Sequence, residues 1–85
     1  MNFKELKKLD LSKNQISDIK VLEKVNLKEL KELYLFRNNI SDIKVLDNLK
    51  FEKLEILHLR YNEIDKIKYS SLISKWKSKI QQFDI

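Results

Sequence analysis

The side chain best suited to acid–base chemistry near neutral pH is the single histidine, His58. Catalysis would need a nucleophile or a metal ion beside it, but the chain has no Cys and Ser12 lies far upstream. One His among scattered carboxylates is also a poor zinc site, because zinc normally takes three or four protein ligands. The chain has no Gly either, which excludes a P-loop, a dinucleotide-binding fingerprint and a nucleophile elbow. We therefore expect no catalytic residue, no metal site and no cofactor.

A second group of side chains has recognition chemistry. Tyr and Arg dominate the energetic hot spots of protein interfaces, and both arginines of the chain lie close to aromatic residues. The candidate partner-binding residues are Tyr34, Phe36, Arg37, Ile56, His58, Arg60 and Tyr61. The alternative is that β-propensity alone places aromatic side chains on a strand face. The choice depends on whether the elements that carry these residues bring them to one surface.

Those elements repeat along the chain with a period of 24 residues. The segment Ile-Ser-Asp-Ile-Lys-Val-Leu is identical at 16–22 and 40–46. The first copy of the pattern consists of Leu6, Leu9, Leu11, Asn14, Ile16, Ile19 and Leu22, the second follows 24 positions later, and the third runs from Leu54 to Ile64 and Ile67. A period of this length indicates a solenoid, in which one repeat cannot bury its own apolar face.

The local pattern changes within each copy. Leu9-Asp10-Leu11, Leu33-Tyr34-Leu35 and Leu57-His58-Leu59 alternate apolar and other residues, which predicts short strands. From Ile16 onward the apolar spacing is three, which predicts a turn of α- or 3₁₀-helix. Ser17 and Ser41 are the expected N-caps of these turns, with Asp18 and Asp42 in the first turn.

The segments LKKLDLSKNQISDI, LKELYLFRNNISDI and LEILHLRYNEIDKI match the pattern LxxLxLxxNxIxxI, which resembles the leucine-rich repeat family. The isoleucine-rich second half is similar to a subclass found in a phosphatase-regulating scaffold and in bacterial internalins, although repeats of that subclass are typically shorter than 24 residues. The resemblance covers about residues 3–67. It implies an α/β solenoid, an arc with short parallel strands on the concave side and short helical or 3₁₀ returns on the convex side.

The resemblance also implies that strand residues between the leucines face the concave side, in columns across the stack. The expected columns are Lys8, Glu32, Ile56 and Gln82; Asp10, Tyr34, His58 and Asp84; Ser12, Phe36 and Arg60; and, just past the strands, Lys13, Arg37 and Tyr61. This arrangement would gather the candidate partner-binding residues on one face. We therefore expect a non-enzymatic protein–protein interaction module whose partner the sequence does not identify.

The asparagines at the end of each predicted strand, Asn14, Asn38 and Asn62, form the structural Asn ladder of the family. An amide has both donors and an acceptor, so it can satisfy backbone groups that a turn would otherwise leave buried and unpaired. We expect these residues to be structural and not to bind a ligand.

The repeat pattern stops after Ile67, and Tyr69, Leu72, Ile73, Trp76 and Ile80 then follow helical spacing. We predict a capping helix over 65–79 with Asp65 as its N-cap, and a terminal strand over 82–85. Trp76 is expected to be a core residue, because the end of a solenoid needs a unit that covers it.

The chain of 85 residues predicts a single domain over 1–85, with repeats at about 3–27, 28–51 and 52–67 and the cap and last strand at 65–85. No comparable cap precedes Leu6, Leu9 and Leu11. Either the chain is part of a longer leucine-rich repeat array, or this N-terminal edge supports a homo-oligomer.

The net charge of +5 raises nucleic acid as an alternative partner, in the form of a basic scaffold with exposed aromatic side chains. The position of the charge argues against it. Residues 66–85 hold five Lys and one Asp and carry +4, whereas residues 1–65 carry +1. With no signal-peptide pattern, no stretch of about 18 apolar residues and no Cys, we expect an intracellular, cytoplasmic protein with no transmembrane segment.

Overall fold

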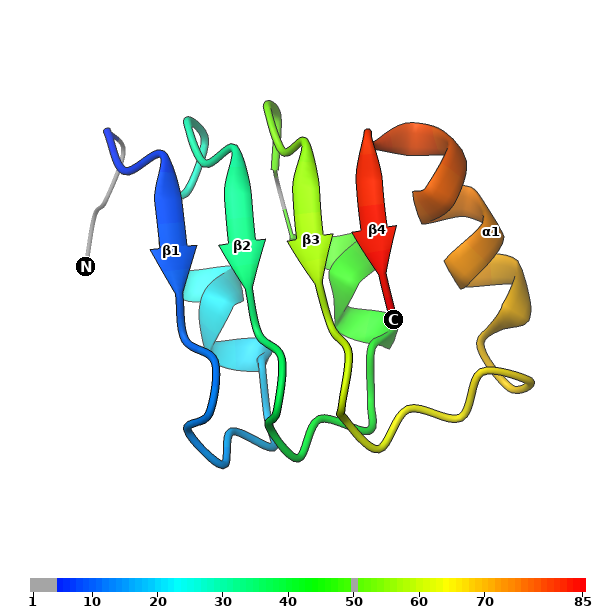
Figure 1. Cartoon of the computed structure of the whole chain (residues 1–85). Coiled ribbons are helices and arrows are strands. Elements are labelled where there is room, and N and C mark those ends of the chain that lie inside the picture. Colours follow the sequence, from blue (N-terminus) through cyan, green and yellow to red (C-terminus); the bar gives the residue numbers. More distant parts are fainter. Residues whose placement is uncertain (1–4, 50) are drawn as a thin grey trace.

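The computed structural model describes residues 5–49 and 51–85 as four parallel strands with helical segments behind them (Figure 1). In chain order the elements are β1 (Lys8–Asp10), the 3₁₀-helix η1 (Lys20–Lys24), β2 (Glu32–Tyr34), the 3₁₀-helix η2 (Lys44–Asn48), β3 (Ile56–His58), α1 (Ser70–Lys79) and β4 (Gln82–Asp84). The strands lie side by side in the order β1-β2-β3-β4, so each return brings the chain back beside its previous strand. The predicted α/β solenoid is confirmed.

The strand register follows the sequence period. Leu9 lies beside Leu33, Leu33 beside Leu57 and Leu57 beside Phe83. The first two steps span 24 residues and the last spans 26, since α1 replaces the 3₁₀-helix in the last return. Equivalent residues therefore stack in straight columns across the sheet.

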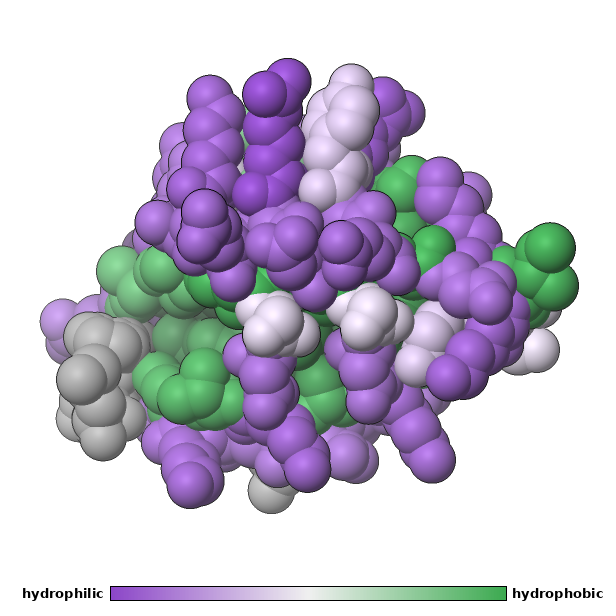
Figure 2. Space-filling view, turned by 90° about the horizontal axis from the view of Figure 1, so that it is seen from below, coloured by the Kyte–Doolittle hydropathy of each residue, from purple (hydrophilic) through white to green (hydrophobic). Residues whose placement is uncertain are grey.

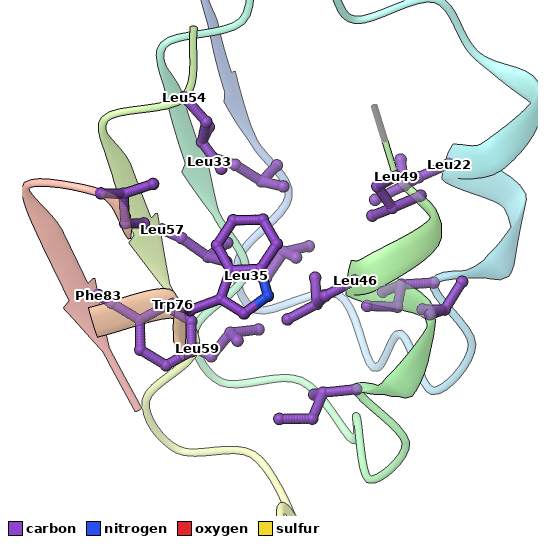
Figure 3. Close-up of a cluster of buried hydrophobic side chains, with 14 of the residues drawn as sticks. Leu22, Leu33, Leu35, Leu46, Leu49, Leu54, Leu57, Leu59, Trp76 and Phe83 are labelled. Carbon is purple, nitrogen blue, oxygen red and sulfur yellow. The ribbon is translucent and has the colours of Figure 1, made fainter. Parts of the chain in front are cut away.

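Leucine and isoleucine side chains fill the space between the sheet and the returns. Leu33, Leu35, Ile43 and Leu57 are fully buried, with 0% of their surface exposed. Figure 3 shows Trp76 projecting from α1 into this cluster beside Phe83, and the two rings lie 6.4 Å apart. Trp76 is 1% exposed, so the prediction that it is a core residue is confirmed.

The turns that begin the 3₁₀-helices differ from expectation. The prediction that Ser17 and Ser41 cap them is wrong, since Ile19 and Ile43 occupy the cap positions without a side-chain bond. The Asp18 carboxylate instead accepts the Lys20 N–H at 2.8 Å, and Asp42 accepts the Lys44 N–H at 3.0 Å. An aspartate bonding two residues ahead makes an Asx turn, which competes with a Ser cap for the same donors.

The start of the capping helix also differs. The expected helix over 65–79 with Asp65 as N-cap is wrong at its beginning, because α1 starts at Ser70. Asp65 caps the preceding turn instead, accepting the N–H groups of Ile67 and Lys68 at 3.1 and 3.0 Å. From this turn onward the chain no longer follows the backbone course of the earlier repeats. As a result Ile67 is 89% exposed, whereas the equivalent residues Ile19 and Ile43 are buried.

Two contacts join α1 and the turn before it to the second repeat. The Tyr69 hydroxyl donates to Asp42 at 3.2 Å, and the Lys75 ammonium lies 3.0 Å from Asp47. The pKa of Asp42 lies below its usual value of 3.8, first because the Lys44 backbone N–H donates to it and also because Tyr69 does. These contacts hold the cap over the end of the core.

Asparagine amides link the turns of neighbouring repeats. Asn38, 6% exposed, accepts the N–H groups of Asn14 and Ile16 through Oδ1, both at 2.9 Å. Its Nδ2 donates to the carbonyls of Leu35 at 3.0 Å and Leu11 at 3.1 Å, one in its own repeat and one in the repeat before. Asn62 repeats the pattern one step along, accepting from Ile40 and donating to Leu35 and Leu59. One side chain thus bonds the backbone of two adjacent turns.

We predict that Asn38→Ala lowers the free energy of unfolding by about 3 kcal/mol or more, because it leaves several part-buried backbone groups unpaired at once. Asn14→Ala is the matched control. Asn14 is exposed and its amide donates within its own turn, to Leu11 and Ser12, so its loss should cost about 1 kcal/mol or less. Urea unfolding followed by circular dichroism measures both, and equal losses would contradict the inter-repeat role of Asn38.

Candidate functional site

The sheet has one face turned away from the core, and alternation along the strands decides which residues it carries. Lys8, Glu32, Ile56 and Gln82 lie in one register column, and Asp10, Tyr34, His58 and Asp84 lie in the next. The leucines between them point to the opposite side and are buried in β2 and β3. We call this surface, together with the residues that follow each strand, the outer strand face.

After β1, β2 and β3, the third residue past the end of the strand has left-handed backbone. Lys13, Arg37 and Tyr61 have φ of 62°, 57° and 61°. A left-handed residue other than Gly costs roughly 1–2 kcal/mol, so the neighbouring bonds must offset it. They include Lys13 N–H to the Phe36 carbonyl at 2.9 Å and Arg37 N–H to the Arg60 carbonyl at 3.0 Å. The sequence contains no Gly to mark these positions, and sequence reasoning missed them.

Cationic side chains lie over the aromatic rings of this face. The Arg37 guanidinium carbon is 5.3 Å from the centre of the Tyr61 ring, and the Lys13 ammonium is 5.9 Å from that of Phe36. The Lys8 ammonium is 5.4 Å from the Tyr34 ring. Each distance is within the range of a cation–π contact. In a view onto the ends of the strands, polar side chains project in a row along one rim, above a band of apolar surface (Figure 2).

Tyr34 is held by two neighbours. Its hydroxyl donates to the Glu32 carboxylate at 2.5 Å, and its ring lies 5.2 Å from the His58 ring at a tilt of 58°. The bond to Glu32 raises the pKa of Tyr34 above its usual value of 10.0, because removing the proton would break the bond and place two negative charges together. The phenol is therefore oriented by neighbours within the same sheet.

His58 is held by Asp84. Its Nε2 lies 2.6 Å from Asp84 Oδ2, so the ring nitrogen donates to the carboxylate. The Gln82 amide nitrogen also donates to Asp84 Oδ2, at 2.8 Å. Its 3.0 Å contact with His58 Nε2 is then a contact between two donors and not a hydrogen bond. The Asp84 carboxylate thus fixes the orientation of the imidazole on the outer strand face.

The Ser12 hydroxyl accepts the Phe36 N–H at 3.1 Å and so takes part in joining two strand ends. Within residues 5–49 and 51–85 no three or more His, Cys, Asp or Glu side chains cluster as a metal ion would require. Asp10, in the same column as His58, accepts the Ser12 N–H, and this backbone bond is the first cause that lowers the pKa of Asp10 below 3.8. The Ser12 hydroxyl and the Asp10 carboxylate are thus both held by hydrogen bonds to the backbone.

The period, the strand register and the Asn links are characteristic of one family. A family model described as "Leucine Rich repeats (2 copies)" matches residues 4–48 and again residues 28–74. The chain belongs to the leucine-rich repeat family. No curated protein and no solved structure matches the chain. Leucine-rich repeat domains are generally protein-interaction modules without enzymatic chemistry of their own.

This leucine-rich repeat domain carries all seven candidate partner-binding residues on the outer strand face or its rim. Tyr34, Phe36, Ile56 and His58 are half-buried. The other three, Arg37, Arg60 and Tyr61, are exposed. The exposed fraction of Tyr61 is 68%, which is high for an aromatic residue. Tyr61 and Arg37 stack on each other, which the alternation of the strands alone did not indicate.

We predict that Glu32→Gln lowers the pKa of Tyr34 toward 10.0, because an amide accepts the hydroxyl less strongly and carries no negative charge. The raised pKa also means that the bond stabilises the fold below pH 10.0 and stops doing so as pH rises through the folded-state value. A pH titration of the Tyr34 ring by NMR measures the shift. Glu63→Gln is the control, and an equal change in both variants would contradict the assignment.

Proposed function

We propose that this leucine-rich repeat domain is a non-enzymatic module that binds a protein partner through the outer strand face, the concave side of the family's arc. The observation that carries the proposal is the set of aromatic and arginine side chains on that face. Tyr61, for example, is 68% exposed and lies beneath the Arg37 guanidinium. Such side chains are enriched where interfaces derive most of their binding energy. The sheet does not need them for its core, which the leucines on the other side supply.

Preorganisation supports the same proposal. Glu32 fixes the Tyr34 hydroxyl, and Asp84 fixes the His58 ring. A side chain that is already ordered loses less rotamer freedom on binding, so more of its contact energy contributes to affinity. The face combines these groups with Lys8, Asp10 and Glu32, a mixture of charges that suits a polar protein surface better than a uniformly charged ligand.

We predict that the double variant Tyr34→Ala/Phe36→Ala loses the partner while the domain still folds, since both side chains are only half-buried on the outer face. The loss should exceed tenfold in affinity if the two aromatics are hot spots, each worth about 1–2 kcal/mol or more. Affinity capture from the native cell, followed by titration of the captured protein, measures it.

The control for this experiment removes apolar surface elsewhere. Val21 and Ile67 are 62% and 89% exposed and lie in η1 and in the turn before α1. Val21→Ala/Ile67→Ala should leave partner binding unchanged. If the control lowers the affinity as much as the Tyr34/Phe36 variant does, then binding does not depend on the outer strand face.

Nucleic acid is the less favoured partner, because the excess of positive charge lies in residues 66–85, which carry +4 through the lysines of the cap. Several already have neighbours there: Lys75 pairs with Asp47, Lys68 lies over Tyr69, and Lys79 lies 4.5 Å from the centre of the Trp76 ring. Within the described residues no helix combines the length and the apolar character needed to cross a bilayer. The absence of cysteine leads us to propose a cytoplasmic location.

We predict no shift of a single-stranded or duplex oligonucleotide in a gel at about 150 mM salt, and at most weak, nonspecific retention at about 20 mM. The net charge of +5 is enough for nonspecific attraction at low salt only. Retention at the higher salt that is lost on Arg37→Ala/Tyr61→Ala would favour nucleic acid over a protein partner.

A further inference from the structure

Among the described residues, the backbone groups on the outer edge of β1 have no hydrogen-bond partner. β1 is the first strand in the sheet order, and within residues 5–49 and 51–85 its partner is β2. The Lys7 carbonyl and the Leu11 N–H bond to β2, and in a parallel ladder of this register the groups of Leu9 do so as well. The N–H and C=O groups of Lys8 and Asp10 therefore point away from β2. Such an edge is a template for another strand.

Apolar side chains lie behind this edge with less cover than their counterparts. The residues concerned, all partly exposed, are Leu6, Leu9, Leu11 and Ile16. The residues 24 positions later, all with 0% exposure, are Leu30, Leu33, Leu35 and Ile40. Apolar surface is visible at the end of the molecule nearest β1 (Figure 2). Backbone groups and apolar surface at one end together favour association.

We infer that β1 pairs antiparallel with β1 of a second copy of this chain, about a two-fold axis at Leu9. In this register Lys8 faces Asp10 of the second copy, and Asp10 faces Lys8 of the second copy. Both are hydrogen-bonded positions of an antiparallel ladder, so the free groups of Lys8 and Asp10 are used in full. Each cross-strand pair joins opposite charges on the outer strand face, which stabilises the pairing.

The Leu9 side chains then meet across the axis on the core side of the sheet. Because the strand alternates, the leucines of both copies point to the same side and the charged pairs to the other. The two copies use the same surface, as a two-fold dimer requires. Their outer strand faces become neighbours on one continuous sheet.

A head-to-tail arrangement, with β1 stacked on β4 of another copy, fits the charges worse. Continuing the existing register would place Asp10 beside Asp84 and Lys8 beside Gln82. Like charges in adjacent strands are destabilising. In Figure 1, α1 also lies beyond β4, and the packing of Trp76 against Phe83 holds the helix to that strand. The charges therefore favour the two-fold arrangement.

The test is the concentration dependence of the mass of the whole chain, measured by sedimentation equilibrium from roughly 10 μM to 1 mM. We expect the mass to rise from 10.3 kDa toward twice that value. Asp10→Lys places two lysines opposite each other at both ends of the pairing, and Lys8→Asp does the same with two aspartates. Each single reversal should weaken the dimer by about tenfold.

The double variant Lys8→Asp/Asp10→Lys restores opposite charges at both positions and should dimerise within about threefold of the wild type. This rescue is specific to the antiparallel register. Lys77→Glu and Glu52→Lys, exposed positions outside β1, apply similar changes of charge and should leave the dimer unchanged. Circular dichroism monitors folding, and Lys8→Asp alone carries the comparison if Asp10→Lys unfolds without its bond to Ser12.

Three results would overturn the inference. The wild type could remain a monomer over the whole range, which would leave the edge to another segment such as a preceding repeat. Asp10→Lys could strengthen association, which is expected of pairing with Asp84 in β4. The double variant could fail to recover. Because Tyr34→Ala/Phe36→Ala leaves β1 intact, it should dimerise normally, so failure of partner binding and failure of this pairing are distinguishable.

Discussion

The fold depends on a polar constraint at the corner between strand and return. Where the chain leaves a strand it turns sharply, and the N–H and C=O groups of that turn lie too close to the core to reach water freely. Asn38 meets this constraint because its single amide accepts from Asn14 and Ile16 and donates to Leu11 and Leu35. The bonds join two repeats, so the corner of one repeat is satisfied only when the next is in place. The register that aligns the outer strand face follows from this coupling.

Sequence periodicity was sufficient to predict the architecture, because every equivalent position must meet the same neighbours in a stack. The 24-residue offset of the leucines corresponds to the observed pairing of Leu9 with Leu33 and Leu57, and helical spacing correctly placed Trp76 inside. Details that depend on competition between nearby groups were not predictable in this way. Asp18 and Asp42 form Asx turns before the 3₁₀-helices in place of serine caps, because a carboxylate two residues before an N–H is a stronger acceptor than a hydroxyl.

The sequence predicted which residues share a column on the outer strand face, but not how their side chains are oriented. Alternation places Tyr34 and His58 beside each other, but the orientation of each ring depends on Glu32 and Asp84, which the columns show only as neighbours. Arg37 and Tyr61, whose side chains stack, both have left-handed backbone. Ordinarily Gly reveals such positions in a sequence. Here side chains occupy them, so the same turn that strains the backbone also displays a cation and an aromatic ring.

The two ends of the sheet differ in how the core is closed, and this difference connects the fold to recognition. At β4, α1 closes the core with Trp76 and is held to the second repeat by Lys75 and Asp47. At β1, the side chains equivalent to fully buried leucines are partly exposed, so this end contributes less apolar burial to stability. A second copy bound there would bury the partly exposed apolar side chains of this end and would place a second outer strand face beside the first. Binding of one partner molecule across both faces would then become partly intramolecular, which raises the effective affinity without any new type of contact.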